Sequence, residues 1–363
     1  MLDPACGSGN FLYVTLEHLK RLEAEVLSQL EAMGDSQARL GLEGETVTLQ
    51  QLRGIEINAR AAALAELVLW IGWLQWHIRT RGSNSVAEPV VHDYGNIECR
   101  DAVLAYDRVE PALDANGRVI TRWDGKTTKP HPVTGEPVPD EAAQVAQWAY
   151  VNPRKAEWPA VDFIVGNPPF IGARTVRAAL GDGYLASVRS VHPNVPANAD
   201  FVMFWWDRCA EACSLAQVRR FGLITTNSIR QALARKVIAH HLTGLLAQGI
   251  RLCIPDHPWV DAVDGAAIRI AMTVVDRSNS PGRLLTVAQE ATDLNGEVRV
   301  TFDEQAGPIN ASLTIGNDLG AATALAANRG MSCVGKQPSP RRVVTGGRWH
   351  AGRPATLQQD TVL

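Results

Sequence analysis

An asparagine followed by two prolines and an aromatic residue is the most informative chemical pattern in this sequence. Asn167, Pro168, Pro169 and Phe170 directly follow residues 161–166, an apolar run typical of a short buried strand. The Asn167 side-chain oxygen and the Pro168 carbonyl are two acceptors, and proline restricts the backbone that carries both. Two rigid acceptors can draw a planar amine toward a nucleophilic, tetrahedral geometry, while Phe170 offers a face for stacking. The pattern predicts chemistry on the amine of a planar group.

A glycine-rich turn near the start of the chain predicts a second functional element. Gly7 and Gly9 lie in the run Asp-Pro-Ala-Cys-Gly-Ser-Gly-Asn, and they lack side chains where a ligand must approach the backbone. The helix expected from Phe11 to about Leu30 presents free N–H groups at its start. The turn alone is weak evidence, because tight turns in many proteins use the same residues.

Two acidic residues at the ends of predicted strands narrow the choice of ligand. Residues 53–57 and 96–101 are expected to be strands, with Glu56 and Asp101 at their carboxyl ends. In a parallel sheet these ends meet at one edge, where ligands bind. Glu56 can accept both hydroxyls of a ribose, and Asp101 the exocyclic amine of an adenine. Together with the turn, they predict a cofactor that contains adenosine; the alternative is that both residues are helix caps.

The elements that must position these residues alternate between strand and helix. Strands are expected at residues 161–166, 220–226 and 250–254 as well, and helices at 59–80, 200–214 (with Asp200 as its cap) and 229–246. This alternation predicts an α/β protein with a doubly wound, mostly parallel sheet, Rossmann-like, with helices on both faces. Residues 267–275 and 282–289 are expected to pair as a hairpin, and the C-terminal segment is expected to be irregular.

The remaining organisation is predicted from prolines, aromatic residues and composition. Seven of the twenty prolines fall between residues 105 and 160, which predicts a long irregular insertion. The helix at 59–80, with Trp70, Trp73 and Trp76, is apolar nearly all round and is expected to be packed between layers. Of Trp205 and Trp206, which are adjacent and cannot share one face, one is expected to be buried. His240 and His241 are expected at the surface.

Composition excludes several classes of protein. A chain of 363 residues with 46% hydrophobic and 20% charged residues is neither disordered nor collagen-like. The net charge of −3 means that an anionic partner must meet a local basic surface, and the mildly basic stretch at 172–260 permits nucleic acid. The longest apolar run, residues 64–76, is too short for a membrane span. The six scattered cysteines suit a reducing cytoplasm and predict no metal site.

Four motifs in order resemble those of class I S-adenosylmethionine-dependent DNA methyltransferases that act on adenine. They are Asp-Pro-Ala-Cys-Gly-Ser-Gly-Asn-Phe at 3–11, Gly-Ile-Glu-Ile-Asn at 54–58, Asn-Ile-Glu-Cys-Arg-Asp-Ala at 96–102 and Gly-Asn-Pro-Pro-Phe at 166–170. Further stretches at 199–202, 222–231, 258–260 and 265–269 are similar to the MmeI-like branch, in which one polypeptide fuses restriction and modification. The resemblance covers about residues 2–276.

The resemblance implies methyl transfer from S-adenosylmethionine to the N-6 amine of adenine in double-stranded DNA, as the modification part of a restriction-modification system. The cofactor-binding residues that it implies are Asp3, Ala5, Cys6, Gly7, Gly9 and Phe11 at the methionine end, Glu56 at the ribose, and Ile57 and Asp101 at the adenine. Asn167, Pro168, Pro169 and Phe170 would receive the target adenine, which must be flipped out of the duplex.

The sequence departs from the family at both ends. Only Met1 and Leu2 precede the glycine turn, whereas a strand spans about five residues. The family's upstream aromatic motif, its nuclease module and most of its target-recognition domain are not in the chain. We therefore expect a catalytic domain at 1–276 and a C-terminal extension at 277–363 that begins a target-recognition region. A separately encoded polypeptide could supply the missing parts.

Two alternatives to this function remain open at the level of sequence. The same asparagine-proline-proline-aromatic motif can act on the amines of RNA bases and on the side-chain amide of glutamine in proteins. The chain could also be an inactive fragment of a larger DNA methyltransferase.

Overall fold

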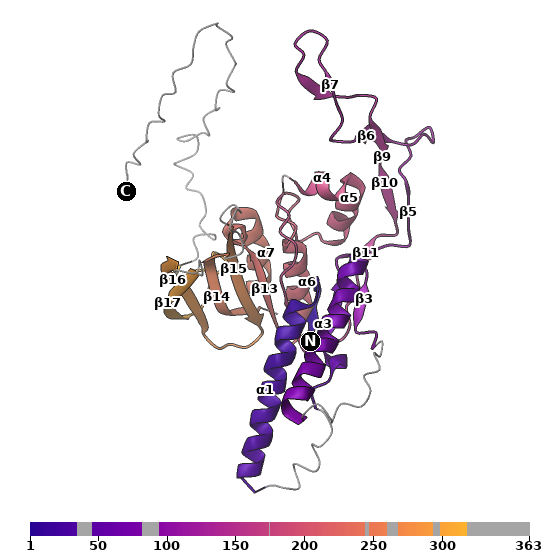
Figure 1. Ribbon diagram of the computed structural model, residues 1–363. Helices are drawn as coiled ribbons and strands as arrows, with labels where there is room; N and C mark the ends of the chain where they lie inside the picture. The colour runs from indigo at the N-terminus through magenta and orange to yellow at the C-terminus, as the bar shows by residue number, and fades with distance from the viewer. Residues whose placement is uncertain are drawn as a thin grey trace, which may run out of the picture. The chain divides into compact units, whose positions relative to one another are not determined.

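A nine-stranded mixed sheet forms the centre of the protein (Figure 1). The computed structural model describes residues 1–34, 46–81, 94–173, 175–243, 247–259, 268–292 and 298–317. The strand order is β17-β16-β14-β15-β13-β12-β1-β2-β3. The bounds are β1 Leu2–Asp3, β2 Arg53–Glu56, β3 Ile97–Cys99, β12 Phe163–Gly166, β13 Arg220–Thr226, β14 Gly249–Pro258, β15 Arg269–Asp276, β16 Gly282–Thr292 and β17 Val298–Gly307.

The half of the sheet that carries the predicted motifs is parallel. β1 pairs in parallel with β2 on one side and with β12 on the other, β2 pairs with β3, and β12 pairs with β13. The predicted doubly wound α/β class is therefore confirmed. Because parallel strands end at one edge, the residues that follow β1, β2, β3 and β12 are brought together.

The other half of the sheet contains antiparallel strands. β15 runs antiparallel to both β13 and β14, and β16 pairs in parallel with β14 and antiparallel with β17. The predicted hairpin of 267–275 with 282–289 is wrong, because β14 lies between β15 and β16. β16 and β17, which lie beyond the predicted domain boundary at residue 276, extend the same sheet. Residues 318–363 of the predicted extension lie outside the described residues, as do residues 260–267 of the resemblance and the last turn of the helix predicted at 229–246.

Helices cover both faces of the sheet. They are α1 Asn10–Ala32, α3 Ala59–Arg81, α4 Val176–Leu180, α5 Asp182–Val191, α6 Met203–Ser214 and α7 Ala232–Leu242, with short 3₁₀ helices η1 Leu49–Gln51 and η3 Asn227–Arg230. In β2, Ile55 packs into a core with residues of α5, α6 and α7, whereas a side chain on Gly54 would meet Cys6 and Ile97 in the core of α1 and α3. Alternate residues of a strand point to opposite faces, so the two cores lie on opposite sides of the sheet.

The helix α3 is less buried than its composition predicts. It packs against α1, β2 and β3, but Leu64, Leu67, Ile71 and Ile78 are each between 42% and 50% exposed. The expectation that it is covered on all sides is therefore wrong. By length and composition α3 is the one helix among the described residues that could cross a membrane. Its packing on the sheet and on α1 is that of a helix in a globular domain.

The proline-rich segment 105–160, expected to be irregular, forms a two-stranded antiparallel ribbon (Figure 1). Its strands pair as β5 with β10, β6 with β9 and β7 with β8, while β4 pairs with β11 at its base. The bounds are β4 Leu104–Ala105, β5 Arg108–Pro111, β6 Thr121–Trp123, β7 Thr128–Pro130, β8 Pro137–Pro139, β9 Gln144–Ala146, β10 Trp148–Val151 and β11 Arg154–Lys155. Both strands of such a ribbon are edge strands, where proline is tolerated because its missing N–H faces solvent.

Candidate active site

A cavity of about 560 Å³ lies where the parallel strands end. Its lining includes residues from each motif that the sequence singled out: Ala5, Glu56, Ile57, Asp101, Asn167 and Pro169. The other predicted site residues lie outside its lining: Asp3, Cys6, Gly7, Gly9, Phe11, Pro168 and Phe170. The structure therefore brings the four motifs to one cavity, with the ends of β2, β3 and β12 as its polar edge.

The glycine turn is shaped by contacts that only glycine permits. Gly7 and Gly9 have positive φ angles of 54° and 85°. A Cβ on Gly9 would lie 3.0 Å from the Cα of Ala65, so the turn packs directly on α3. The backbone N–H of Gly7 donates to Glu56 Oε2 at 2.9 Å, which ties the turn to the end of β2. The turn is thus held in a geometry that a side chain at either glycine would strain.

Glu56 lies between the turn and the cavity, with unused acceptor capacity. Its Oε1 accepts the backbone N–H of Asn58 at 2.8 Å, and its Oε2 accepts that of Gly7. Each carboxylate oxygen has two lone pairs, so both oxygens can take a further hydrogen bond. Glu56 does not cap α3, because the Asn58 side chain accepts the N–H of Arg60 at 3.0 Å. The helix-cap alternative is therefore wrong for Glu56.

Asp101 is fixed by its own loop and by a tyrosine. Its Oδ1 accepts the backbone N–H groups of Val103 and Leu104 at 2.7 and 3.0 Å, and its Oδ2 accepts the hydroxyl of Tyr184 at 2.6 Å. Strand β4, and not a helix, follows this turn, so Asp101 is not a helix cap either. Burial, and next the charge of Asp101, raise the pKa of Tyr184, which keeps its hydroxyl protonated as a donor.

Two buried side-chain oxygens near the cavity have no partner among the described residues. They are the side-chain oxygen of Asn167 and the Oδ2 of Asp3. They belong to neighbouring strand ends, and a Cβ on Gly166 would lie 2.6 Å from Asp3 Oδ1. Buried polar atoms are normally paired, so unpaired acceptors beside a cavity indicate ligand donors. The Asn167 oxygen, together with Glu56 and Asp101, fits an adenosine cofactor and an amine substrate.

An aromatic wall that also lines the cavity was not predicted from the sequence. Its rings follow one another at centroid distances of 4.9, 5.7, 6.3 and 5.0 Å in the order Tyr106, Tyr150, Tyr184, Phe201, Trp205, and all five line the cavity. Tyr150 lies in β10, which pairs with β5, and Tyr106 lies between β4 and β5 at the base of the ribbon. No local pattern joins these residues, because the ribbon and α5 bring them together from distant parts of the chain.

The tryptophan pair of α6 is buried on both sides. Trp205 faces the cavity and donates to the Pro4 carbonyl at 3.0 Å, while Trp206 donates to Thr273 Oγ1 on β15 at 3.3 Å. Both are less than 10% exposed, so α6 is covered on two faces and not on one. Asp200 does not cap this helix, which begins at Met203; its carboxylate instead accepts from the Ala173 N–H and the Ser228 hydroxyl.

Some expected residues stand apart from the cavity. Phe170 is half-buried, while Pro169 and Ile171 on either side of it line the cavity. Its role as a stacking platform stays a prediction. His241, expected at the surface, is buried against Asp207, whereas His240 is exposed. Among the residues that the structure describes, no cluster of three or more His, Cys, Asp or Glu side chains could hold a metal ion.

We expect Gly183→Ala to open the aromatic wall. A Cβ on Gly183 would lie 1.7 Å from the backbone oxygen of Trp148, so α5 and β10 must separate to admit it. Overpacking of this kind costs about 1–3 kcal/mol. Gly172→Ala is the matched control, because the nearest atom to its Cβ lies 4.0 Å away. Urea unfolding should show a clear loss for Gly183→Ala alone; equal stability of the two variants would contradict the close contact.

We expect the stability of the protein to fall as pH rises because of Asp3. Burial, opposed by the Ala5 N–H and aided by the charge of Glu56, raises the Asp3 pKa from 3.8 to about 7. Between these values the folded state holds a proton that the unfolded chain has lost, so the free energy of unfolding decreases with pH. The contribution is at most roughly 1.4 kcal/mol per pH unit.

Asp3→Asn removes this titration and is the control. In urea titrations between pH 5 and pH 7, the unfolding free energy of the wild type should decrease relative to that of the variant. Parallel pH curves for the two proteins would show that Asp3 ionises normally in the folded state.

Comparisons with known proteins agree with this arrangement. A family model described as the MmeI DNA-methyltransferase domain matches residues 1–286. DNA methyltransferase A of Bacillus subtilis (strain 168) is 27% identical over 233 residues, which are 63% of this chain and 21% of that protein. The solved structure of the Type IIL restriction-modification enzyme MmeI in complex with DNA matches with a TM-score of 0.51 and 22% identity, over 88% of this chain and 36% of that one.

The structural likeness shows a shared fold, and the family model identifies the lineage. The chain spans about a fifth of the length of the Bacillus protein and about a third of the MmeI chain. The family model, in contrast, matches well over half of this chain and includes all four motifs around the cavity. The chain belongs to the family of the MmeI DNA-methyltransferase domain.

Proposed function

We propose that this protein transfers a methyl group from S-adenosylmethionine to the N-6 amine of adenine in double-stranded DNA, as the modification part of a restriction-modification system in the cytoplasm. The observation that carries the proposal is the buried side-chain oxygen of Asn167, which has no partner among the described residues, in a cavity that Glu56 and Asp101 also line. Membership of a DNA-methyltransferase family supports DNA as the substrate.

The cofactor would bind on the side of the cavity that Glu56, Ile57 and Asp101 line. Glu56 accepts the ribose hydroxyls with the lone pairs that Gly7 and Asn58 leave free. Asp101 accepts the amine of the adenine ring, and Ile57, which is 70% exposed at the cavity, packs on that ring. When bound, S-adenosylmethionine supplies an activated methyl group. The glycine turn would hold the methionine end of the cofactor, through Asp3, Ala5, Cys6, Gly7, Gly9 and Phe11.

The target side is assigned to the asparagine-proline-proline-phenylalanine segment. Asn167 and the Pro168 carbonyl accept hydrogen bonds from the adenine amine and hold it in a tetrahedral geometry, with its lone pair directed at the methyl carbon. Pro169 and Phe170 contact the flipped base. The new N–C bond would form as the S–CH3 bond of the cofactor breaks, with S-adenosylhomocysteine as the leaving group. The amine would lose its proton to water after this step, so no general base is needed at hydrogen-bond distance. Positioning and electrostatics therefore supply the rate.

A comparison of three substrates tests this proposal against its enzyme alternatives. The chain is incubated with labelled S-adenosylmethionine and, in parallel, with duplex DNA, total RNA or protein that contains accessible glutamine. We expect label in DNA only. Label in RNA or in glutamine would replace DNA as the substrate, and cofactor binding without transfer to any of the three would favour an inactive fragment.

A further inference from the structure

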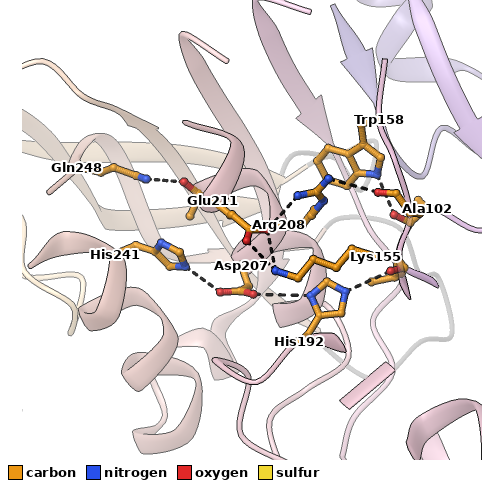
Figure 2. A network of polar contacts seen from close by, with 12 residues as sticks. Ala102, Lys155, Trp158, His192, Asp207, Arg208, Glu211, His241 and Gln248 are labelled. Atoms are coloured by element: carbon orange, nitrogen blue, oxygen red, sulfur yellow. Dashed lines mark hydrogen bonds and ion pairs between the residues drawn. The ribbon is translucent and has the colours of Figure 1, made fainter. Parts of the chain in front are cut away.

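Helix α6 carries three charged side chains, Asp207, Arg208 and Glu211, of which Asp207 is buried and the other two are partly buried (Figure 2). Asp207 is fully buried, and its two oxygens face two histidines from different elements. Oδ1 lies 2.8 Å from Nε2 of His241 on α7, and Oδ2 lies 3.7 Å from Nδ1 of His192 at the end of α5. Asp207 thus joins α5, α6 and α7 at one point.

His192 connects this point to the cavity. Its Nε2 lies 3.1 Å from the backbone oxygen of Val103, and because a carbonyl can only accept, Nε2 carries the hydrogen. The backbone N–H of the same Val103 donates to Asp101 Oδ1. His192 is fully buried, so water does not compete for either contact. A continuous path of polar contacts therefore runs from Asp207 through His192 and Val103 to the carboxylate of Asp101.

The other two charged residues of α6, Arg208 and Glu211, contact β11 and the residues that follow it at the end of the ribbon. Glu211 pairs with Lys155 at 2.7 Å and with Arg208 at 2.9 Å. Arg208 also donates to the Ala156 carbonyl at 3.3 Å and lies 5.5 Å from the ring centre of Trp158. The indole of Trp158 donates to the Ala102 carbonyl at 2.8 Å. Two consecutive carbonyls of the Asp101 loop, those of Ala102 and Val103, are therefore held by donors that α6 supports.

The charge on Asp207 gives this arrangement its rigidity. Burial alone would raise the Asp207 pKa, but the two histidines that face its oxygens, His192 at 3.7 Å and His241 at hydrogen-bond distance, hold it well below the usual range of a carboxyl group. A carboxylate that stays ionised in the interior must keep its partners, because an unpaired buried charge is very costly. His192 is therefore confined between Asp207 and Val103.

We propose that His192 and Asp207 are positioning residues for cofactor recognition, which hold Val103 so that the Asp101 carboxylate faces the adenine amine of the cofactor. The inference rests on the function proposed above for Asp101. It adds residues that neither the motifs nor the cavity lining include, and it assigns the histidine on α5 a role that the histidine on α7 does not share.

The test measures how well the protein distinguishes two ligands that differ at that amine. S-adenosylhomocysteine carries the adenine amine, and S-inosylhomocysteine has a carbonyl oxygen in its place. Calorimetry gives the dissociation constant of each ligand for the full chain. We expect the wild type to prefer S-adenosylhomocysteine by about tenfold or more, since loss of a hydrogen bond to a charged acceptor has this order of effect.

His192→Leu removes the side-chain donor to the Val103 carbonyl and leaves the backbone N–H of Ala156 at 3.4 Å in place, and His241→Leu is the matched control. Both variants deprive the same carboxylate of a buried histidine, and His241 is the closer of the two, so loss of stability affects the control at least equally. We expect the preference for the adenine ligand to fall at least about threefold in His192→Leu and to stay unchanged in His241→Leu. His192→Gln, which restores an amide donor near the position of Nε2, should recover most of the preference.

Each outcome decides between the inference and the function on which it rests. A wild-type protein that binds both ligands equally, or neither, overturns the proposed role of Asp101 and the inference with it. A wild type that discriminates, beside a folded His192→Leu that discriminates equally well, overturns the inference alone. Equal loss in both histidine variants would also overturn it, because that result indicates a general structural role. If His192→Leu does not fold, His192→Asn takes its place, since its amide is too short to reach the Val103 carbonyl.

Discussion

Replacing Asn167 by alanine is expected to lower the rate of methyl transfer by at least about a hundredfold, the usual effect of removing one preorganised hydrogen-bonding group that stabilises a transition state. The Asn167 oxygen is buried, lines the cavity and has no partner among the described residues, so its hydrogen-bonding capacity is free for the substrate amine. S-adenosylmethionine affinity should change by less than about threefold, because the side chain addresses the target and not the cofactor.

The two effects are separated by two measurements on one preparation. Single-turnover transfer of labelled methyl to duplex DNA gives the rate, and calorimetry gives the cofactor affinity. Asn167→Asp is the informative second variant, because it keeps an oxygen acceptor of the same length and should retain more activity than Asn167→Ala. If the alanine variant methylates adenine at the wild-type rate, the mechanism proposed for this segment is wrong.

Replacing Glu56 by alanine is expected to weaken S-adenosylmethionine binding by at least about tenfold. The variant loses the acceptor for two ribose hydroxyls, and hydrogen bonds to a charged group contribute about 1.5–3 kcal/mol each. It also frees the N–H of Gly7, which Glu56 holds at 2.9 Å, so the glycine turn is no longer tied to β2.

A carboxylate outside the cavity controls for the change in net charge. Glu110 on the ribbon is 46% exposed and pairs with Arg108 at 3.0 Å, so Glu110→Ala removes the same charge without touching the site. Calorimetry should show the loss of affinity for Glu56→Ala only. Wild-type affinity in Glu56→Ala would mean that the cofactor does not bind in this cavity.

The residues at the strand ends could be predicted because each motif is local. Gly7 and Gly9 need positive φ angles, Glu56 ends a short strand and Asn167 directly follows one in the sequence. Once the sheet is parallel, these segments must share an edge, and Glu56 and Asn167 line one cavity there. Sequence patterns within about ten residues therefore contain most of the polar half of the candidate site.

The strand order at β15, the aromatic wall and the ribbon depend on contacts between segments that are distant in the sequence. The sequence predicts the wrong neighbour for β15, because a strand that inserts between β13 and β14 has no local signature that distinguishes it from a hairpin strand. Tyr106 and Tyr150 join the cavity only because the ribbon pairs β5 with β10. The prolines of that ribbon suggested irregular structure, since sequence alone does not reveal that its strands are edges.

Identifying the methylated nucleoside is the decisive test of the proposed reaction. Duplex DNA is incubated with the protein and S-adenosylmethionine that carries a trideuterated methyl group, then digested and analysed by mass spectrometry. We expect deuterated N6-methyl-2′-deoxyadenosine from the wild-type reaction and almost none from the Asn167→Ala reaction. Deuterium in a methylated cytosine, or equal N6-methyladenine yields from the two proteins, would contradict the proposed reaction.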